Sequence, residues 1–413
     1  MVDENKPDEK KDMKEEQASP EDDLLKKYGT IAEEILRKNP IDYIVKTMSK
    51  MHLGDDSIKT LLLLASFSPY VLRSNEYIHV TVIGPSGMGK SNAVQAFLAC
   101  LPPNFYEYWS GCSEKYPFYH CMNNPKILDK KILYVDDDVL IDASFVRSIK
   151  TPSRNGIVNY GTVMDQKPIE LRIIGTPVVF ESKVRTHIDS QDRTRSLLVE
   201  VDNSEDHQKL VRRFIIENEC MDKKSEDVSG CFIIAQTIYL MLIRSGWKDV
   251  IISEELGNKI PEFIDARKLK RFIGLIKCSA FVNQFRREHR GNSLIATEED
   301  LNVALSIYSS FLSSEIFGVD SIDIEILKIL QISKDVDYDK IALLIKKSYG
   351  TAYNRVQRLA ENGLVTTFNE DRKDFVLLTD SGSSVLQLLG ASPMQEDNKK
   401  NNIKIKDDTP YPS

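Results

Sequence analysis

Residues 77–91 read YIHVTVIGPSGMGKS, and this stretch decides the fold. Its first seven residues are mostly apolar or β-branched and predict a buried strand. Residues 84–91 match the pattern GxxxxGKS, and residues 92–101 predict a helix directly after it. A strand, a glycine-rich loop and a helix in this order are the context in which the pattern binds phosphate. We therefore expect an α/β P-loop protein, with a parallel sheet flanked by helices, that binds a nucleoside triphosphate, with ATP as the leading candidate.

The residue types in the loop suit this ligand. Glycines allow the backbone to curl so that its N–H groups converge on phosphate oxygens, and the following helix adds the positive end of its dipole. Lys90 is expected to reach the β and γ phosphates, and the Ser91 hydroxyl is expected to complete the coordination shell of Mg²⁺. The expected cofactor-binding residues are Gly84, Pro85, Ser86, Gly87, Met88, Gly89, Lys90, Ser91 and Asn92.

A second buried strand ends in acidic residues, since residues 131–138 read KILYVDDD. Asp136 is the candidate carboxylate that holds Mg²⁺ together with Ser91. Asp137 takes the place of the residue that orients the attacking water, where a glutamate is usual. The shorter aspartate would stand further from that water, which predicts slow hydrolysis. An acidic turn without a catalytic role is the alternative interpretation.

Polar residues also accompany two strands expected further along the chain. Residues 171–180 predict a third strand, and either Ser182 or Thr176 could sense the γ-phosphate near its end. A further strand is expected directly after Arg195. An arginine in that position can point into a neighbouring subunit and neutralise charge on the transferred phosphoryl group. Arg193 is the second candidate for this role, and a surface salt bridge is the alternative.

The order of these parts resembles an AAA+ ATPase and, more closely, the minichromosome-maintenance (MCM-like) helicases. Residues 53–59, LGDDSIK, are similar to the family's lead-in to the phosphate loop. Residues 266–276, ARKLKRFIGLI, resemble the lid helix that carries its second sensor arginine, which would be Arg267. Residues 296–300, ATEED, resemble the cap of the next lid helix. The resemblance covers residues 51–313.

This resemblance implies an ATP-dependent DNA helicase or translocase that acts in DNA replication or its initiation as a homo-oligomeric ring, a hexamer in the family. The catalytic residues that it implies are Lys90, Asp136, Asp137, Arg195 and Arg267. The family's large N-terminal collar is not expected, because too few residues precede the loop. Compact chains of this kind resemble the initiator-helicases of plasmids, viruses and other mobile elements.

Helicases of this group also grip DNA with hairpins in a central pore. Residues 154–168 have room for one such hairpin, with Arg154 and Lys167 as candidate pore residues. A solvated turn is the alternative interpretation of this segment.

After Gly318 the pattern changes to three short amphipathic helices and two β-rich arms, which predict a winged-helix domain over residues 319–390. Residues 320–390 carry nine basic and eleven acidic groups, but residues 346–358 have four basic groups and no acid. This favours DNA binding by the third helix and the wing, with protein binding as the alternative. The candidate DNA contacts are Tyr353, Asn354, Arg355 and Arg358 as exposed helix residues, Lys346 and Lys347 near phosphates, and Arg372 and Lys373 in the wing.

Composition sets the remaining domain boundaries. Residues 1–23 hold ten acidic and four basic side chains, and so account for most of the net charge of −7. We expect disordered tails at 1–24 and 391–413. Between the tails, an AAA+ core is expected at 25–205 and a helical lid at 206–318, before the winged-helix domain.

Several classes of protein are disfavoured. The sequence has no run of eighteen apolar residues and no secretory pattern, so we expect no membrane partner and a cytoplasmic location. The six cysteines are scattered without a CxxC pair, which fits a reducing compartment. Cys112, His120 and Cys121 lack a fourth partner at metal-site spacing, so packing is preferred over metal binding.

Two functions of different classes remain open. The first is the ATP-driven helicase that the resemblance implies. The second is a nucleotide-switched DNA-binding regulator or origin-marking ATPase without processive unwinding, which Asp137 and the missing collar favour. Protein remodelling by the same ATPase core is a third possibility, but no substrate domain for it is recognisable.

Overall fold

A computed structural model describes residues 19–111, 113, 116–136, 143–164, 166–184, 195–219, 228–261, 264, 266–315, 321–333, 336–370 and 373–388. The chain divides into two compact units, Met1–Phe311 and Leu312–Ser413. Four residues singled out from the sequence lie outside the described residues, namely Cys112, Asp137, Arg193 and Arg372. The same holds for the tail expected at 391–413 and for most of the one expected at 1–24.

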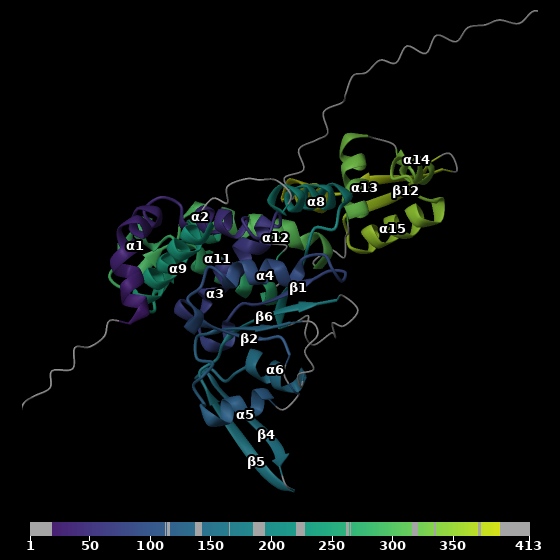
Figure 1. Cartoon of the computed structure of the whole chain (residues 1–413). Helices are drawn as coiled ribbons and strands as arrows, with labels where there is room; N and C mark the ends of the chain where they lie inside the picture. The colour runs from purple at the N-terminus through teal and green to yellow at the C-terminus, as the bar shows by residue number, and fades with distance from the viewer. Residues whose placement is uncertain are drawn as a thin grey trace, which may run out of the picture. The chain divides into compact units, whose positions relative to one another are not determined.

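The first unit is built around a parallel sheet (Figure 1). Its five strands lie in the order β2-β3-β6-β1-β7, and every neighbouring pair is parallel. The side chains of β1 and β3 are all buried, as expected for parallel strands that helices cover. The predicted parallel sheet is confirmed. The strands are β2 Tyr106–Trp109, β3 Ile132–Val135, β6 Val178–Lys183, β1 His79–Ile83 and β7 Ser196–Glu200.

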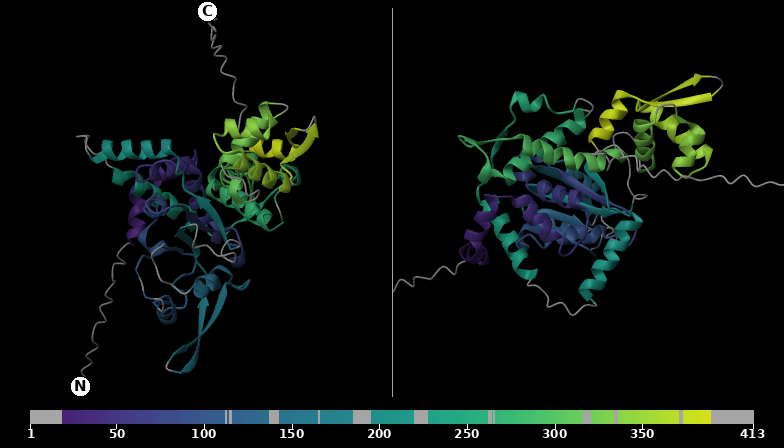
Figure 2. Two further views of the ribbon diagram at one scale, coloured as in Figure 1. Left: turned by 90° about the vertical axis from the view of Figure 1, so that its right-hand side faces the viewer. Right: turned by 90° about the horizontal axis from the view of Figure 1, so that it is seen from above.

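Helices flank this sheet (Figure 2), and α3 and α4 both pack against β1 and β6. Most of the segment expected to form a lid at 206–318, up to Phe311, falls in the same compact unit as the sheet. The helices of this unit are α1 Pro20–Leu36, α2 Pro40–Met48, α3 Asp56–Ser66, α4 Lys90–Leu98, α5 Tyr116–Asn123, α6 Ala143–Lys150, α8 Glu205–Glu219, α9 Val228–Arg244, α10 Glu254–Gly257, α11 Ala266–Val282 and α12 Glu298–Glu315. Three short strands form a small second sheet, β8 Asp249–Ile251, β9 His289–Arg290 and β10 Ser293–Ile295. In the described ranges, no helix is long and apolar enough to cross a membrane.

The acidic tail expected at 1–24 ends earlier than predicted, because α1 begins at Pro20. The Ser19 side chain caps this helix by accepting a hydrogen bond from the backbone N–H of Asp22. Proline in the first turn and three acidic residues there favour a helix start. Asp22 also pairs with Arg244 of α9 at 2.6 Å. The expectation of disorder for residues 19–24 is therefore wrong.

An antiparallel hairpin stands in the connection between β3 and β6. Its strands are β4 Ile157–Met164 and β5 Lys167–Ile174, with Ile157 opposite Ile174 and Met164 opposite Lys167. The prediction of one continuous strand over residues 171–180 is wrong, because residues 171–174 belong to this hairpin and β6 starts at Val178. Gly175 separates the two strands with a φ of +83°, and a Cβ there would overlap the side-chain carboxylate of Asp129. Close packing at a glycine therefore breaks the apolar run.

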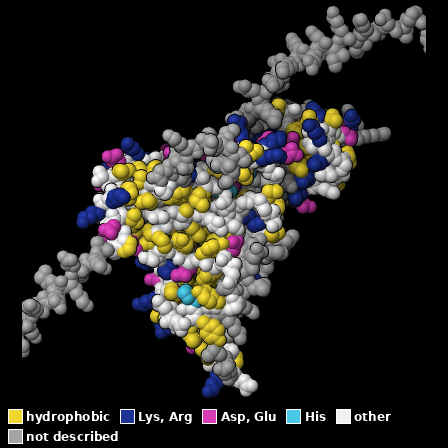
Figure 3. Space-filling model, viewed as in Figure 1, with side chains coloured by type: hydrophobic (Ala, Val, Ile, Leu, Met, Phe, Trp, Pro, Cys, Tyr) yellow, Lys and Arg dark blue, Asp and Glu magenta, His cyan; other side chains and the backbone are white. Residues whose placement is uncertain are grey.

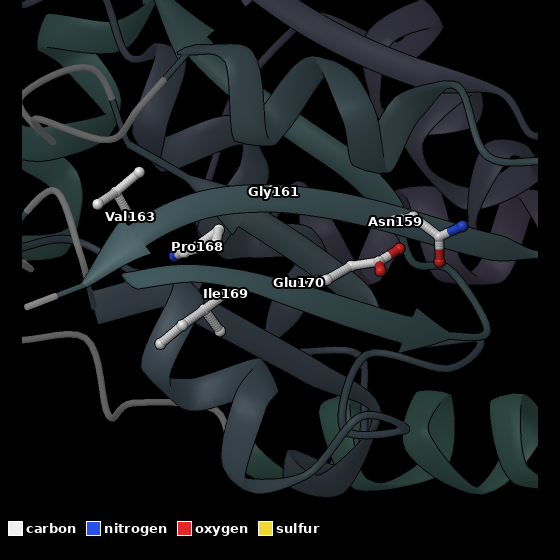
Figure 4. A pocket seen from close by; sticks show the side chains of 6 residues that line it. All are labelled: Asn159, Gly161, Val163, Pro168, Ile169 and Glu170. Carbon is white, nitrogen blue, oxygen red and sulfur yellow. The ribbon is translucent and has the colours of Figure 1, made fainter. Parts of the chain in front are cut away.

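One face of the hairpin packs on α5 and α6, where Val158, Leu171 and Ile173 join a core cluster with Phe118 and Phe145. The other face is open and carries Val163, which is 67% exposed. Figure 3 shows hydrophobic side chains along the hairpin and α5, with a Lys or Arg side chain at the far end. An open depression of about 590 Å³ lies on the hairpin (Figure 4), and its lining residues are Asn159, Gly161, Val163, Pro168, Ile169 and Glu170.

Buried polar groups connect the hairpin's base to the sheet. Lys150, the last residue of α6, pairs with Glu181 of β6, and Lys150 Nζ also donates to Ser196 Oγ at 3.0 Å. Burial opposes ionisation of Glu181, but Lys150 and Lys183 outweigh it and lower its pKa to about 2. His79 of β1 lies beside this pair. Its Nδ1 accepts from the Val179 N–H at 3.1 Å, so Nε2 carries the proton that it donates to the Lys150 carbonyl oxygen.

This arrangement predicts that the stability of the folded state falls at acid pH because of His79. Burial, reinforced by the charge of Lys150, lowers the pKa of His79 from 6.5 to about 3. The folded state therefore takes up no proton here between those values, while the unfolded state does, so stability is complete above pH 6.5 and falls as the pH drops. At pH 5 the loss is about 2 kcal/mol.

Denaturant unfolding at pH 7 and pH 5 measures this loss. In His79→Asn, the amide oxygen can still accept from Val179 N–H, but the titrating group is gone. The difference between the two pH values should shrink by about 2 kcal/mol in this variant. An unchanged difference would show that other groups cause the acid sensitivity.

The second unit has its own hydrophobic core, which includes Ile326, Leu327, Ile341, Val356 and Val376. Three helices precede a β-hairpin, in the order that the sequence predicts. A short strand and a final helix, which were not predicted, complete the unit, and the three strands lie in the order β11-β13-β12. The elements are α13 Ser321–Ile332, β11 Val336–Asp337, α14 Tyr338–Leu344, α15 Tyr349–Glu361, β12 Val365–Glu370, β13 Lys373–Leu378 and α16 Asp380–Leu388.

Candidate nucleotide-binding site

The glycine-rich loop connects the end of β1 to the start of α4. Gly87 and Gly89 have φ values of +78° and +83°, a backbone conformation that residues other than glycine rarely adopt. Gly84 is required for a different reason, because a Cβ at this position would lie 2.6 Å from Val201 Cγ2. Lys90 is 6% exposed, and its Nζ donates to the carbonyl oxygen of Pro85 at 3.0 Å. The lysine ammonium thus lies over the loop, where a phosphate chain would bind.

Asp136 lies beside this loop, one residue after β3. Ser91 Oγ donates to Asp136 Oδ1 at 2.8 Å, so the serine and the aspartate expected to hold a metal ion are in direct contact. A hydroxyl and a carboxylate oxygen are donors of the type that Mg²⁺ prefers. In the described part of the chain, no group of three or more His, Cys, Asp or Glu side chains could hold a metal ion. The donor set therefore fits a cation that takes its remaining ligands from phosphate and water.

Two tyrosines that were not predicted complete the surroundings of Asp136. Tyr134 donates to Asp136 Oδ1 at 3.1 Å, and Tyr108 donates to Oδ2 at 3.0 Å. The two rings stack with centroids 5.0 Å apart. Burial raises the pKa of both tyrosines, so both hydroxyls remain donors at neutral pH. Tyr134 could have been found from the sequence, because it precedes Asp136 by two residues and shares its side of the strand. Tyr108 carries no such local signal.

Of the two candidate sensor residues, only Ser182 lies at this cluster. Its Oγ is 2.8 Å from Asp136 Oδ1, 2.8 Å from Tyr134 OH and 3.3 Å from Ser91 Oγ. Thr176 precedes β6 at the opposite end of the strand, and its buried hydroxyl has no hydrogen-bond partner among the described residues. The geometry therefore favours Ser182.

The expected arginines are less completely described. Arg195 lies directly before β7 and is partly exposed. The next residue, Ser196, is held from two sides, since Lys150 Nζ donates to its hydroxyl at 3.0 Å and Arg271 Nη1 donates to its carbonyl oxygen at 3.3 Å. Arg267 is in the first turn of α11, but its side chain lies outside the described residues. Asp137 and Arg193 also lie outside them.

Asn92, expected to contact the cofactor, has its side-chain amide turned toward the two residues that precede the lead-in. Asn92 Nδ2 donates to the Met51 carbonyl oxygen at 3.0 Å and lies 3.4 Å from His52 Nδ1. Near the sheet edge, Cys121 is a buried free thiol and His120 stacks on Tyr116. Cys112, the third residue of this group, lies outside the described residues.

The candidate DNA contacts of the second unit divide into two groups. Lys346, Lys347, Tyr353, Asn354 and Lys373 are exposed. Tyr349, which was not predicted, is 50% exposed and stacks with Tyr353 at 6.5 Å between centroids.

Arg355 and Arg358 behave differently, because both pair with Asp323 of α13, a carboxylate that is fully buried. The expectation that Arg355 is exposed is wrong, since its side chain is 20% exposed, whereas Arg358 is exposed as expected, at 44%. A buried carboxylate must be paired, and these two arginines neutralise it.

The sheet, the loop and the helix that follows it define an α/β P-loop NTPase domain. A family model described as the MTBMA_p00010 P-loop domain matches residues 27–244, which is more than half of the chain, and the chain belongs to this family. The chain is also similar to the uncharacterized protein MTBMA_p00010 of Methanothermobacter marburgensis, with 25% identity over 328 residues. The matched region covers 75% of this chain and 40% of that relative, so the chain spans less than half of the relative's length.

Proposed function

We propose that the chain is an AAA+ ATPase of the MCM-like kind, and that it uses ATP and Mg²⁺ to act on DNA as a helicase or translocase in replication or its initiation. The observation that carries the nucleotide part is the contact between Ser91 and Asp136 at 2.8 Å, next to the buried Lys90. The hairpin and the sequence resemblance support the DNA part.

Each residue of the site has a role in this proposal. The glycine-rich loop binds the phosphate chain through its N–H groups, and Lys90 neutralises the terminal phosphates. Ser91 and Asp136 hold Mg²⁺, which when bound neutralises charge on the phosphate oxygens. Ser182, in contact with both, responds to the presence of the γ-phosphate. Asp137 orients the attacking water, and Arg195 and Arg267 act on nucleotide in a ring of identical subunits.

DNA would contact two parts of the chain. The hairpin β4–β5 is the candidate pore element, with Lys167 beside its turn and Arg154 at its base. The second unit is proposed as a winged-helix domain, in which α15 and the β12–β13 arm approach DNA. The exposed Lys346 and Lys347 supply positive charge for phosphates, whereas Arg355 and Arg358 mainly hold Asp323.

The ATPase rate and the mass of the oligomer, each measured with and without single-stranded DNA, test this proposal. We expect a ring whose ATPase rate rises with single strands, and ATP-dependent unwinding of forked DNA. A protein that never oligomerises, or that neither unwinds nor translocates, would rule out the motor. Stable binding to specific duplex sites with slow turnover would instead support the nucleotide-switched regulator, which the aspartate at position 137 favours.

The two lysines after α14 give a separate test of the DNA surface. Lys346→Ala/Lys347→Ala should weaken DNA binding on all sequences alike, because lysine–phosphate contacts carry no sequence information. The slope of log affinity against log salt should fall by roughly two for duplex DNA. Lys340→Ala, an exposed lysine on α14, is the matched control. An unchanged salt slope would exclude this surface.

A further inference from the structure

Resting on the proposed nucleotide site, we propose that Asp55 is a positioning residue that holds the phosphate-binding loop at both ends. Asp55 stands in the lead-in, directly before α3, and its side chain is 5% exposed. It reaches the loop through two intermediaries, His52 on one side and the backbone after β7 on the other.

The first connection runs through His52. His52 Nε2 lies 2.9 Å from Asp55 Oδ2, and both side chains are 5% exposed. The Asn92 amide, which also donates to Met51, lies 3.4 Å from His52 Nδ1. Because an amide N–H can only donate, Nδ1 is the acceptor and Nε2 carries the proton that is donated to Asp55. The ring is thereby fixed against Gly89, where a Cβ would lie 3.3 Å from His52 Cε1.

The second connection runs through the residue after Val201. Asp55 Oδ1 accepts the backbone N–H of Asp202 at 2.9 Å. Val201, one residue earlier, packs against Gly84 so closely that a Cβ there would lie 2.6 Å from its Cγ2. The first and the last glycine of the loop are therefore each packed against a group that is tied to one carboxylate.

Both carboxylate oxygens are used, and this makes the residue type specific. Asp55 has a φ of +53°, a left-handed conformation that aspartate, asparagine and glycine tolerate better than other residues. Asparagine therefore suits the backbone, but it offers one acceptor oxygen where the structure uses two. Glycine suits the backbone and offers none. The clasp formed by His52, Asp55 and Asp202 thus requires an aspartate.

The consequence is a loop that is shaped before the ligand arrives. A cradle of N–H groups gains affinity when its geometry is fixed in advance, because binding then needs no ordering of the loop. Losing a hydrogen-bond partner that orients a metal ligand typically lowers affinity or activity by about 10- to 100-fold, and we expect a loss of similar size here. The loss of affinity should concern binding of the phosphate chain, and it should be the same whichever base the nucleotide carries.

Asp55→Asn in the full chain tests this inference. Affinity is measured for Mg·ATP and for inorganic triphosphate with Mg²⁺, and steady-state hydrolysis gives KM and kcat. We expect both ligands to bind roughly tenfold more weakly or worse, and KM to rise more than kcat falls. Asp42→Asn, an exposed aspartate of α2, is the matched control and should leave both affinities unchanged.

A second variant keeps the test decisive if Asp55→Asn does not fold. His52→Phe preserves ring packing on Gly89 but removes the hydrogen bond to Asp55, so it should weaken both ligands similarly. Where both variants fold, their combination should cost less than the sum of the two losses, because they break one connected unit.

Equal triphosphate binding in wild type and variants would overturn the inference that the clasp positions the loop. If only ATP binding weakened, these residues would instead act on binding of the nucleoside. Absence of triphosphate binding in the wild type would contradict the proposed function itself.

Discussion

Lys90→Ala is expected to lower nucleotide hydrolysis by about 10²- to 10³-fold, the scale seen when one preorganised donor is removed from a charged transition state. The ammonium group lies over the loop, 3.0 Å from the Pro85 carbonyl oxygen, and a triphosphate would replace that contact with a charged one. Triphosphate binding should weaken as well, because the positive charge acts on the ground state too. Phosphate release and nucleotide titration measure the two effects.

Lys126→Ala is the control for this prediction, since it removes an exposed lysine elsewhere in the same unit. Its hydrolysis rate should equal that of the unsubstituted chain. Thermal unfolding of Lys90→Ala should show an intact fold. Hydrolysis that continued undiminished in Lys90→Ala would mean that the loop is not the reaction site.

Asp136→Asn is expected to reduce hydrolysis by a similar factor, about 10²-fold or more, by removing the charged ligand from the proposed Mg²⁺ site. Four hydroxyls converge on this carboxylate, from Ser91, Ser182, Tyr134 and Tyr108. An amide keeps the volume but loses the charge and one acceptor oxygen. Nucleotide binding without Mg²⁺ should be nearly unaffected, whereas the enhancement of binding by Mg²⁺ should be lost.

A graded comparison makes this prediction specific. Tyr134→Phe removes one neutral hydroxyl from the same cluster and leaves the carboxylate charge in place. It should therefore reduce hydrolysis much less than Asp136→Asn. Equal losses in the two variants would indicate that the cluster acts through its hydrogen bonds rather than through the charge of the carboxylate.

Local patterns predicted which residues of the candidate site lie together, because each of its main parts is encoded within a few residues. The loop is read from Gly84 to Ser91, and Asp136 follows an apolar run that forms β3. Since the carboxyl ends of parallel strands share one edge of a sheet, the two segments meet without further information. Ser182 is at the same edge by the same rule, although the sequence could not separate it from Thr176.

Features that depend on distant contacts were not predictable in this way. Tyr108 reaches Asp136 from β2, and nothing near it in the sequence marks the contact. Arg355 has the spacing of an exposed helix residue, but Asp323, 32 residues earlier, draws it inward. The division of residues 171–180 into a hairpin arm and a sheet strand depends on Gly175 packing against Asp129. In each case the deciding partner is remote, and apolar periodicity carries no record of it.

The point of insertion of the hairpin has a mechanical consequence. The excursion departs from the sheet at Asp136 and returns at Val178, four positions ahead of Ser182. Lys150, within the excursion, grips Glu181, the immediate neighbour of Ser182. A change in the distance between Asp136 and Ser182 would therefore displace both connections of the hairpin to the sheet. It would also displace the ion pair between Lys150 and Glu181. A small displacement where the hairpin joins the sheet would become a larger displacement at the far end of the hairpin.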